Sequence, residues 1–295
     1  MTNNEVAIAP ADSVVEQPEK KEPIGIFTWV CVTWLALNVL VAVLAPLLPI
    51  PDPNEMISSP GMGMSLGHLM GTDDLGRDIF GRLAWGSRIS LGVGIGSMAI
   101  AFGIGGPLGM LAAYRRGKLD VILSSVMFAF LAFPSIIAII AVLSFWTPRS
   151  LGKIIVVIGI SSIPLVYRVM RAAALSAGSK EYVTAARVQG AKDRRIIFRE
   201  LLPNVAPTGL SFLLFGVATV IALEGVLAFL GLSIAPDIAP SWGNMINDAR
   251  QSLNDVPQNW PLIIFPSAIL CFFILALNFV GDRLRSYFDV TEVKL

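Results

Sequence analysis

The sequence predicts an all-α protein that crosses a membrane about six times. Of its 295 residues, 55% are hydrophobic and 15% are charged, and its mean hydropathy is +0.71. Soluble domains carry a larger charged fraction, so this composition indicates a polytopic membrane protein. The apolar residues also fall in runs near the ~20 residues that a helix needs to cross a bilayer. The predicted spans lie near residues 24–48, 89–114, 121–146, 154–170, 209–230 and 262–281.

Residues 1–22 precede the first span and are polar, with acidic residues and prolines but no apolar run. This composition is typical of disorder, so we expect a disordered cytoplasmic tail followed by one transmembrane domain, 23–295. The run at 24–48 is too long for the core of a signal peptide and is not followed by a convincing small-residue cleavage site. We therefore expect it to remain as a membrane anchor.

The segment 71–94 carries charges into the second span. Asp74 and Asp78 stand four residues apart, as do Asp78 and Arg82, so one helical face could carry an acidic pair and an ion pair. Two interpretations stay open. The segment is either a solvated helix ahead of the membrane or part of an outer rim that meets another protein.

Glycines recur within the span at 89–114, with small-x-x-x-small spacing at Gly92 and Gly96 and again at Gly105 and Gly109. Small residues at this spacing let membrane helices approach closely. A dinucleotide-binding loop would need a preceding strand, and this charge-free span has none. The glycines therefore predict helix packing.

The span at 154–170 has the shortest apolar run, 154–167, so we expect Arg168 to reach towards the interface and lengthen it. Topology supports a span here. Six spans keep Lys20, Lys21 and the basic turn at 115–118 on the cytoplasmic side, whereas five would export them. The positive-inside rule thus favours six spans with both termini in the cytoplasm.

A polar, basic segment at 178–204 separates the fourth and fifth spans. Ser179 and Asp193 are candidate N-caps of two short helices. Gly190 can end the first helix and Pro203 can limit the second. We expect a helix, a turn that projects furthest from the membrane, and a second helix. On charge alone, anionic lipid head groups could equally hold this segment.

Glu224 lies inside the fifth span, where an ionisable residue is a functional-site hypothesis by default. No basic residue lies at matching depth, so the carboxyl group is either protonated, hydrogen-bonded to Asn278 or a serine, or paired with a second chain. Its position near the outer end of the span fits an external gate better than a central binding site.

The outer segment 229–253 contains Pro236 and Pro240, which exclude one continuous helix. Trp242 suits an anchor at the membrane interface, and substrate contact is the weaker alternative. After the last span, Arg283 fits both the cytoplasmic side and the negative end of a helix. We expect it to mark where that span stops.

The sequence lacks the residues that common catalytic and metal sites require. His68 is the one histidine and lies between the first two spans, so neither a Ser/His dyad nor an H-E-x-x-H zinc site can form. The chain contains no G-x-x-x-x-G-K-[ST] phosphate-binding loop. Cys31 and Cys271 fall in predicted spans, without metal or disulfide spacing. The net charge of +1 suggests no nucleic-acid partner.

The basic segment carries two alanines, a glycine and a leucine-proline pair at fixed spacing: Ala185, Ala186, Gly190, Leu202 and Pro203. This arrangement resembles the cytoplasmic loop by which importer permeases of the ATP-binding cassette (ABC) class dock onto their ATPases. The acidic residue of that pattern is displaced here to Glu181, and Glu200 stands where the pattern has an aliphatic residue.

The segments 71–94 and 229–253 are similar to the same family, specifically to the second, C-type permease of dipeptide and oligopeptide importers. The resemblance runs over about residues 71–289 and implies the type I importer permease fold in a bacterial inner membrane. It also implies four kinds of partner: a second homologous permease, one or two ATPases that bind ATP and magnesium, a substrate-binding protein outside, and lipid. It implies no cofactor or metal on this chain and no ATPase activity of its own.

The resemblance assigns coupling to the ATPases to nine residues: Glu181, Ala185, Ala186, Gly190, Ala191, Lys192, Asp193, Arg194 and Arg195. It assigns a rim for the binding protein to Asp74, Arg77, Asp78 and Trp242. Glu224 is a candidate for the pathway or its gate. The alternatives are a permease for nickel or another small solute, a stand-alone secondary transporter, which would need inverted repeats and a midplane ionisable cluster, and a non-transporting scaffold.

Overall fold

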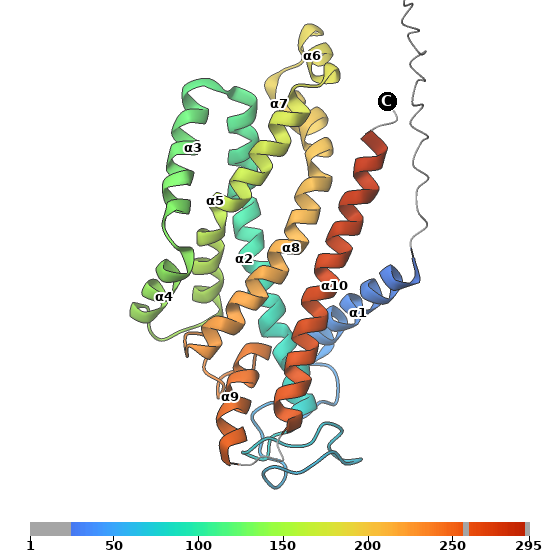
Figure 1. Cartoon of the computed structure of the whole chain (residues 1–295), viewed down its shortest axis with the longest axis vertical. Helices are drawn as coiled ribbons and strands as arrows, with labels where there is room; N and C mark the ends of the chain where they lie inside the picture. Colours follow the sequence, from blue (N-terminus) through green and yellow to red (C-terminus); the bar gives the residue numbers. More distant parts are fainter. Residues whose placement is uncertain (1–24, 256–259, 293–295) are drawn as a thin grey trace, which may run out of the picture.

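The chain folds into a bundle of long helices that run between two ends, one carrying α6 and the other carrying α9 (Figure 1). The computed structural model describes residues 25–255 and 260–292, so the predicted tail at 1–22 lies outside the described residues. The all-α prediction is confirmed. The helices are α1 (Ile26–Leu44), α2 (Ile79–Arg115), α3 (Gly117–Ala132), α4 (Ser135–Phe145), α5 (Leu151–Gly178), α6 (Glu181–Val188), α7 (Asp193–Arg195), the π-helix η1 (Ile196–Leu201), α8 (Leu202–Phe229), α9 (Trp242–Asp255) and α10 (Trp260–Glu292).

Within the described ranges, five helices are long and apolar enough to cross a membrane, and a bent pair of helices makes six. The pair is α3 and α4, which meet at an angle of 76°. The span expected at 121–146 is therefore bent, because Pro134 disfavours helical geometry in the residue before it. Phe133 is accordingly extended, with φ −89° and ψ 130°.

Helix α5 is 28 residues long and extends beyond both ends of the span expected at 154–170. Arg168 does not mark the end of the helix, because an alanine-rich stretch with high helix propensity follows it. At 1.5 Å per residue, α5 is about 42 Å long and exceeds the ~30 Å hydrocarbon core. The helix therefore extends out of the membrane towards α6. The last span likewise continues past Arg283 to the end of α10.

Helix α2 begins ten residues before the predicted span at 89–114. Asp78 is its N-cap and accepts a hydrogen bond from the Gly81 amide at 2.7 Å. This contact satisfies one of the amides that a helix leaves free at its start. Arg82 lies in the first turns of α2, where carboxylates surround it, so a charged residue here does not end the helix.

Helices α2 and α5 cross at two of the predicted glycines. A Cβ atom on Gly109 would lie 2.6 Å from the Tyr167 carbonyl oxygen and 2.9 Å from the Arg171 nitrogen. A Cβ on Gly105 would lie 2.7 Å from the Ile163 carbonyl oxygen. Only glycine permits this approach, so the packing prediction is confirmed here. At the other predicted pair the contacts are with side chains of α5: a Cβ on Gly96 would lie 3.1 Å from Ile155, and a Cβ on Gly92 would lie 3.9 Å from Leu151.

The second half of the polar segment is continuous with the fifth span. Helices α7, η1 and α8 form one span candidate, Asp193–Phe229, of 37 residues. Pro203 was expected to limit a short helix, and this expectation is wrong. The π-helix precedes the proline, and the Leu202 amide bonds to the Ile197 carbonyl, five residues back. This wider turn carries the helix into Pro203, whose missing N–H falls in the first turn of α8.

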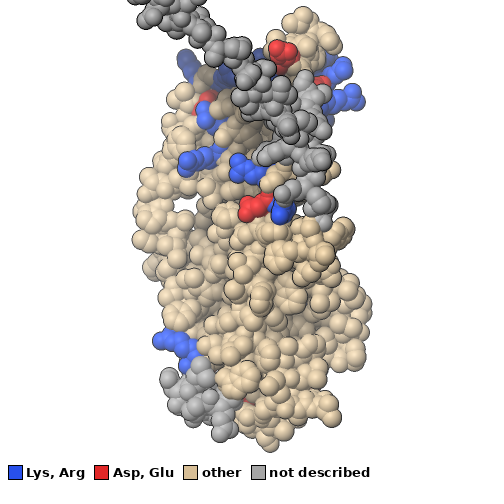
Figure 2. All heavy atoms as spheres, turned by 45° about the vertical axis from the view of Figure 1, so that its right-hand side comes forward, with Lys and Arg blue, Asp and Glu red and all other residues tan. Residues whose placement is uncertain are grey.

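The two ends of the bundle differ in the number of basic side chains on the surface that Figure 2 shows. Figure 2 shows lysine and arginine side chains gathered over the half that carries α6, whereas the middle of this face is almost free of charge. The uncharged band corresponds to the apolar windows of the spans.

Candidate functional site

The first candidate site is α6, which projects beyond the ends of the long helices (Figure 1). Ser179 does not cap it as expected, because its hydroxyl donates to the Ser176 carbonyl at 2.8 Å. Lys180 is the N-cap residue and makes no side-chain capping bond. Glu181 lies in the first turn, where its charge complements the positive end of the helix dipole.

Gly190 ends α6, as the sequence predicts. Its φ is +76°, in the left-handed region that favours glycine. The Gly190 amide donates to the Arg187 carbonyl at 2.9 Å, and the Ala191 amide donates to the Ala186 carbonyl at 3.0 Å. These two bonds form a Schellman motif, which satisfies the last carbonyls of the helix and reverses the chain.

Asp193 does not cap a second helix, because the end of α2 engages its carboxylate. The Tyr114 hydroxyl donates to it at 2.7 Å, and Arg115 lies 3.6 Å away. The Arg187 guanidinium lies 5.1 Å from the centre of the Tyr114 ring, within the range of a cation–π contact. Helix α6 and the start of α7 are therefore both held against the end of α2.

One face of α6 packs inward and the other is open. Val183 is buried, whereas the Val188 side chain is 84% exposed. The exposed face borders a shallow depression lined by Ser179, Glu181, Thr184, Ala185, Val188 and Gln189. Lys192, Arg194 and Arg195 add an exposed basic edge, while Ala186 and Ala191 are half-buried. Small and apolar side chains beside positive charge suit a protein partner that carries an acidic, grooved surface.

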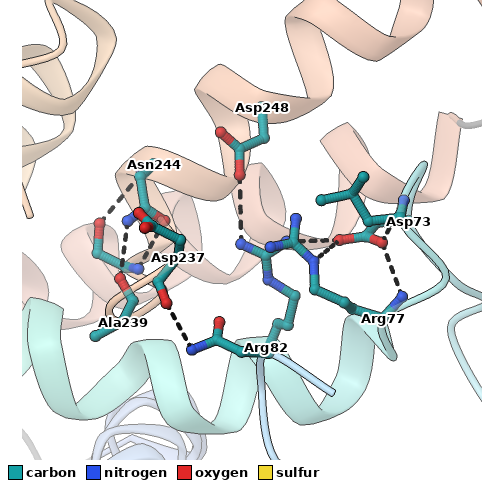
Figure 3. Close-up of polar contacts among 10 residues, drawn as sticks. Asp73, Arg77, Arg82, Asp237, Ala239, Asn244 and Asp248 are labelled. Atoms are coloured by element: carbon teal, nitrogen blue, oxygen red, sulfur yellow. Dashed lines mark hydrogen bonds and ion pairs between the residues drawn. The ribbon is translucent and has the colours of Figure 1, made fainter. Parts of the chain in front are cut away.

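The second candidate site is a cluster of buried charges at the α9 end (Figure 3). The fully buried Asp73 accepts from Arg77 Nε at 2.6 Å and from Arg82 Nη1 through the same carboxylate oxygen. Arg82 also reaches Asp248 on α9, with Nη2 3.3 Å from Oδ2. Burial raises the pKa of the Asp248 carboxyl, and the positive charge of Arg82 opposes that rise. The cluster joins the α1–α2 segment, α2 and α9.

The predicted charge pairs at 71–94 do not form. Because α2 starts at Ile79, Asp74 and Asp78 do not share a helical face. Asp78 instead pairs with His68, whose Nδ1 lies 2.9 Å from its carboxylate. The solvated-helix interpretation is wrong, because Arg77 and Asp78 are buried. Of the four predicted rim residues, only Asp74 is exposed.

Trp242 is not an interfacial anchor, because its ring is fully buried inside the protein. Its indole N–H donates to the Leu83 carbonyl at 3.2 Å, and its backbone N–H donates to the Ser90 hydroxyl at 3.1 Å. The ring packs against Phe273 of α10, with 5.3 Å between the ring centres. Trp242 therefore holds the start of α9 between α2 and α10.

Glu224 is buried and bonded to two serines, one of the alternatives that the sequence left open. Its Oε1 accepts from Ser233 at 2.6 Å and from Ser241 at 2.8 Å. Ser241 in turn caps α9, since it accepts from the Asn244 amide at 3.1 Å and donates its own amide to the Asn244 side chain at 2.8 Å. A Cβ on Gly243 would lie 3.1 Å from Glu224 Oε2. The carboxyl group therefore lies against the first turn of α9.

Sequence reasoning missed Asp73 and Asp248 and gave Arg82 the wrong partner. The sequence did indicate that Arg82 needs a partner, because an arginine in a helix that enters a membrane must be paired or reach water. The partner itself was hidden, since 166 residues separate Arg82 from Asp248. Nothing in the local pattern brings those two positions together.

The chain is similar to membrane components of transport systems. Residues 105–290 match the family described as binding-protein-dependent transport system inner membrane component. The chain is 36% identical over 252 residues to the dipeptide transport system permease protein DppC of Alkalihalophilus pseudofirmus, covering 85% of this chain and 81% of the relative. It is 37% identical over 227 residues to the glutathione transport system permease protein GsiD of Pectobacterium atrosepticum, covering 77% and 74%.

A third relative, the dipeptide transport system permease protein DppC of Haemophilus influenzae, is 32% identical over 263 residues, with 87% of this chain and 88% of the relative covered. Among solved structures, the inward-facing MetNI methionine ABC transporter superposes with a TM-score of 0.57 at 21% identity. The match covers 71% of this chain and 96% of the MetNI chain. At this identity the likeness concerns the fold.

Proposed function

The chain belongs to the binding-protein-dependent transport system inner membrane components and is an ABC importer permease with the type I fold, and we propose that it imports dipeptides or oligopeptides. The substrate class rests on relatives that are named for dipeptide, peptide and glutathione transport. Their similarity extends over most of the chain, including both candidate sites. The proposal therefore favours peptides over nickel, and an ATP-driven complex over a stand-alone transporter.

The observation that carries the proposed mechanism is the open face of α6. A short helix that projects from the bundle, with an exposed Val188 and a basic edge, supports docking onto a separate ATPase. ATP and magnesium would be bound by the ATPases, and this chain would supply the pathway and the coupling contact. We place the α6 end in the cytoplasm, because lysine and arginine gather there (Figure 2). Both termini would then be cytoplasmic, in a bacterial inner membrane.

At the opposite, external end, a substrate-binding protein would meet the segment around Asp74 and α9. The exposed Asp74 can contact it directly, whereas the buried Arg77, Asp78 and Trp242 would shape the surface from beneath. A second, homologous permease would complete the pathway. Two such chains would alternate between outward and inward openings as the ATPases close. Helix α6, the proposed coupling helix, and the outer rim around Asp74 would then act on the same spans.

Changing Val188 to glutamate is expected to detach the ATPases. A charge buried in a docking contact without a partner is costly, and central apolar contacts contribute about 2 kcal/mol or more, so ATPase recovery should fall about tenfold or more. The measurement is affinity purification of the tagged chain in mild detergent, followed by mass spectrometry and a radiolabelled dipeptide uptake assay.

Leu66→Glu is the matched control, because it adds the same charge to a fully exposed apolar residue in the α1–α2 segment at the other end. This variant should retain its ATPases. A wild-type chain recovered without any ATPase, from a preparation where a known ABC complex survives, would refute the coupling role. A complete complex that imports no peptide would refute the substrate class alone.

We also propose that Glu224 belongs to the external gate. Its carboxyl group lies against the first turn of α9, where the helix dipole would favour an ionised form by about 0.3–1 kcal/mol. Glu224→Gln keeps an oxygen for Ser233 and Ser241 but cannot ionise, so the complex should assemble and peptide uptake should slow by about two- to fivefold. Glu224→Ala leaves both hydroxyls without their acceptor and should lower assembly as well. Uptake unchanged in Glu224→Gln would exclude the gate role.

A further inference from the structure

Helix α3 lies at the edge of the bundle, since none of its residues is buried, and polar side chains join it to α5. The strongest contact joins it to α5. Arg171 donates from Nε to one oxygen of Asp120 at 2.6 Å and from Nη2 to the other oxygen at 2.7 Å. The two side chains are 27% and 15% exposed, so the pair is partly shielded from water. A bidentate contact of this kind fixes orientation as well as distance.

The ion pair is extended by a hydroxyl bridge. Ser124, one turn along α3, donates to Asp120 at 3.2 Å and lies 2.9 Å from the hydroxyl of Tyr167 on α5. Tyr167 is fully buried, and its carbonyl oxygen is the atom that a Cβ on Gly109 of α2 would approach most closely. The stretch of α5 at 167–171 is thus in contact with both α3 and α2.

This stretch leads directly to the coupling helix. Seven residues separate Arg171 from the end of α5 at Gly178, about 10 Å of helix without a proline. Only Ser179 and Lys180 then precede α6. A displacement of α6 is therefore passed to Arg171 through a short, rigid segment.

Helix α3 also leads to the other end of the molecule. It continues through the bend into α4, and the segment after α4 carries Arg149, whose Nη1 donates to the Gly231 carbonyl at 2.6 Å. Gly231 lies two residues after the end of α8, at the α9 end. The α3–α4 pair therefore connects the inner half of α5 to the segment that leads into α9.

We propose that Asp120 and Arg171 are positioning residues for transport, which make the bent α3–α4 span follow the coupling helix. This inference rests on the proposed function, since it assumes that α6 receives the movement of an ATPase. A displacement of α6 would displace α5, and the ion pair between Asp120 and Arg171 would displace α3 and α4 with it. The outer mouth would thereby respond to events at the cytoplasmic face.

The test uses the whole complex in proteoliposomes and measures ATP hydrolysis and peptide uptake together. In Asp120→Asn and Arg171→Gln, hydrolysis should stay within about twofold of wild type while uptake falls about fivefold or more, the lower range of typical coupling energies. The quantity of interest is the number of ATP molecules hydrolysed per peptide imported, which should rise. The charge-swapped double variant, Asp120→Arg with Arg171→Asp, should bring that ratio back towards wild type.

Arg168→Gln is the matched control. Arg168 lies three residues away on the same helix, is exposed, and makes no ion pair within the described chain. Its ratio of ATP to peptide should equal that of wild type. Variants of Asp120 and Arg171 that lose hydrolysis and uptake in proportion, or a swapped variant no better than the single ones, would overturn the proposal. Failure of the proposed function would be seen already in the wild-type complex.

Discussion

Arg82→Met is expected to prevent most of the chain from assembling into a stable complex. The change keeps an unbranched side chain of similar reach but leaves Asp73, which is fully buried, with one arginine fewer. Asp248 also loses a positive neighbour. Removing one member of a buried ion pair typically costs about 3–5 kcal/mol, because the remaining charge stays buried without compensation. The measurement is thermal unfolding of the detergent-purified complex, together with its yield from size-exclusion chromatography.

Arg88→Met provides the control for this variant. Arg88 lies six residues further along α2, is exposed, and stacks on the Trp85 ring at 5.4 Å. Its replacement should change stability by about 0.5 kcal/mol or less, as for other surface positions. Adding Asp73→Asn to Arg82→Met should recover part of the loss, because it removes the uncompensated charge. Equal stability of the Arg82 and Arg88 variants would show that the cluster contributes little.

Gly109→Ala is expected to lower the unfolding temperature clearly, although it adds one methyl group. The new Cβ would lie 2.6 Å from one backbone atom of α5 and 2.9 Å from another, and neither can move without shifting the helix. Overpacking of this kind costs about 1–3 kcal/mol. The same crossing positions Tyr167 and Arg171, so peptide uptake should fall together with stability.

Gly103→Ala makes the comparison decisive, because a Cβ there would meet nothing within 4 Å. Alanine is the better helix former by about 0.5–1 kcal/mol, so this variant should be neutral or slightly more stable. The two glycines lie six residues apart on one helix, and the same substitution is expected to act in opposite directions. If both variants unfold at the same temperature, the close α2–α5 crossing is not what stabilises the bundle.

The fold class follows from composition and from runs of apolar residues, because the bilayer permits few alternatives to helices. Helix ends were less predictable. Arg168 was read as the limit of an apolar run, yet it lies inside α5. Helix α2 begins before the predicted span and contains Arg82, which carboxylates neutralise. The break at Pro134 is a local signal that the span prediction did not use, whereas the passage of the helix through Pro203 depends on a π-helix that no local rule predicts.

In the candidate sites, too, local features could be predicted from the sequence and contacts between helices could not. The turn at Gly190 is a local structure, and a glycine with positive φ is readable from sequence. The contacts of Asp193, Asp248 and Arg171 are not, since each partner lies on another helix and the pairing depends on how the helices cross. Sequence therefore locates the segment that we propose for coupling, while the charges that connect it to the rest of the protein require the tertiary structure.

The π-helix between α7 and α8 sets the rotational phase of a whole span. An α-helix turns about 100° per residue, so the extra residue in a wide turn rotates everything that follows by a similar angle. Glu224 faces Ser233 and Ser241 only in the present phase. The number of residues between the coupling segment and Glu224 is therefore as constrained as their identity. Losing or gaining one of them would leave α6 in place and turn the carboxylate away from the start of α9.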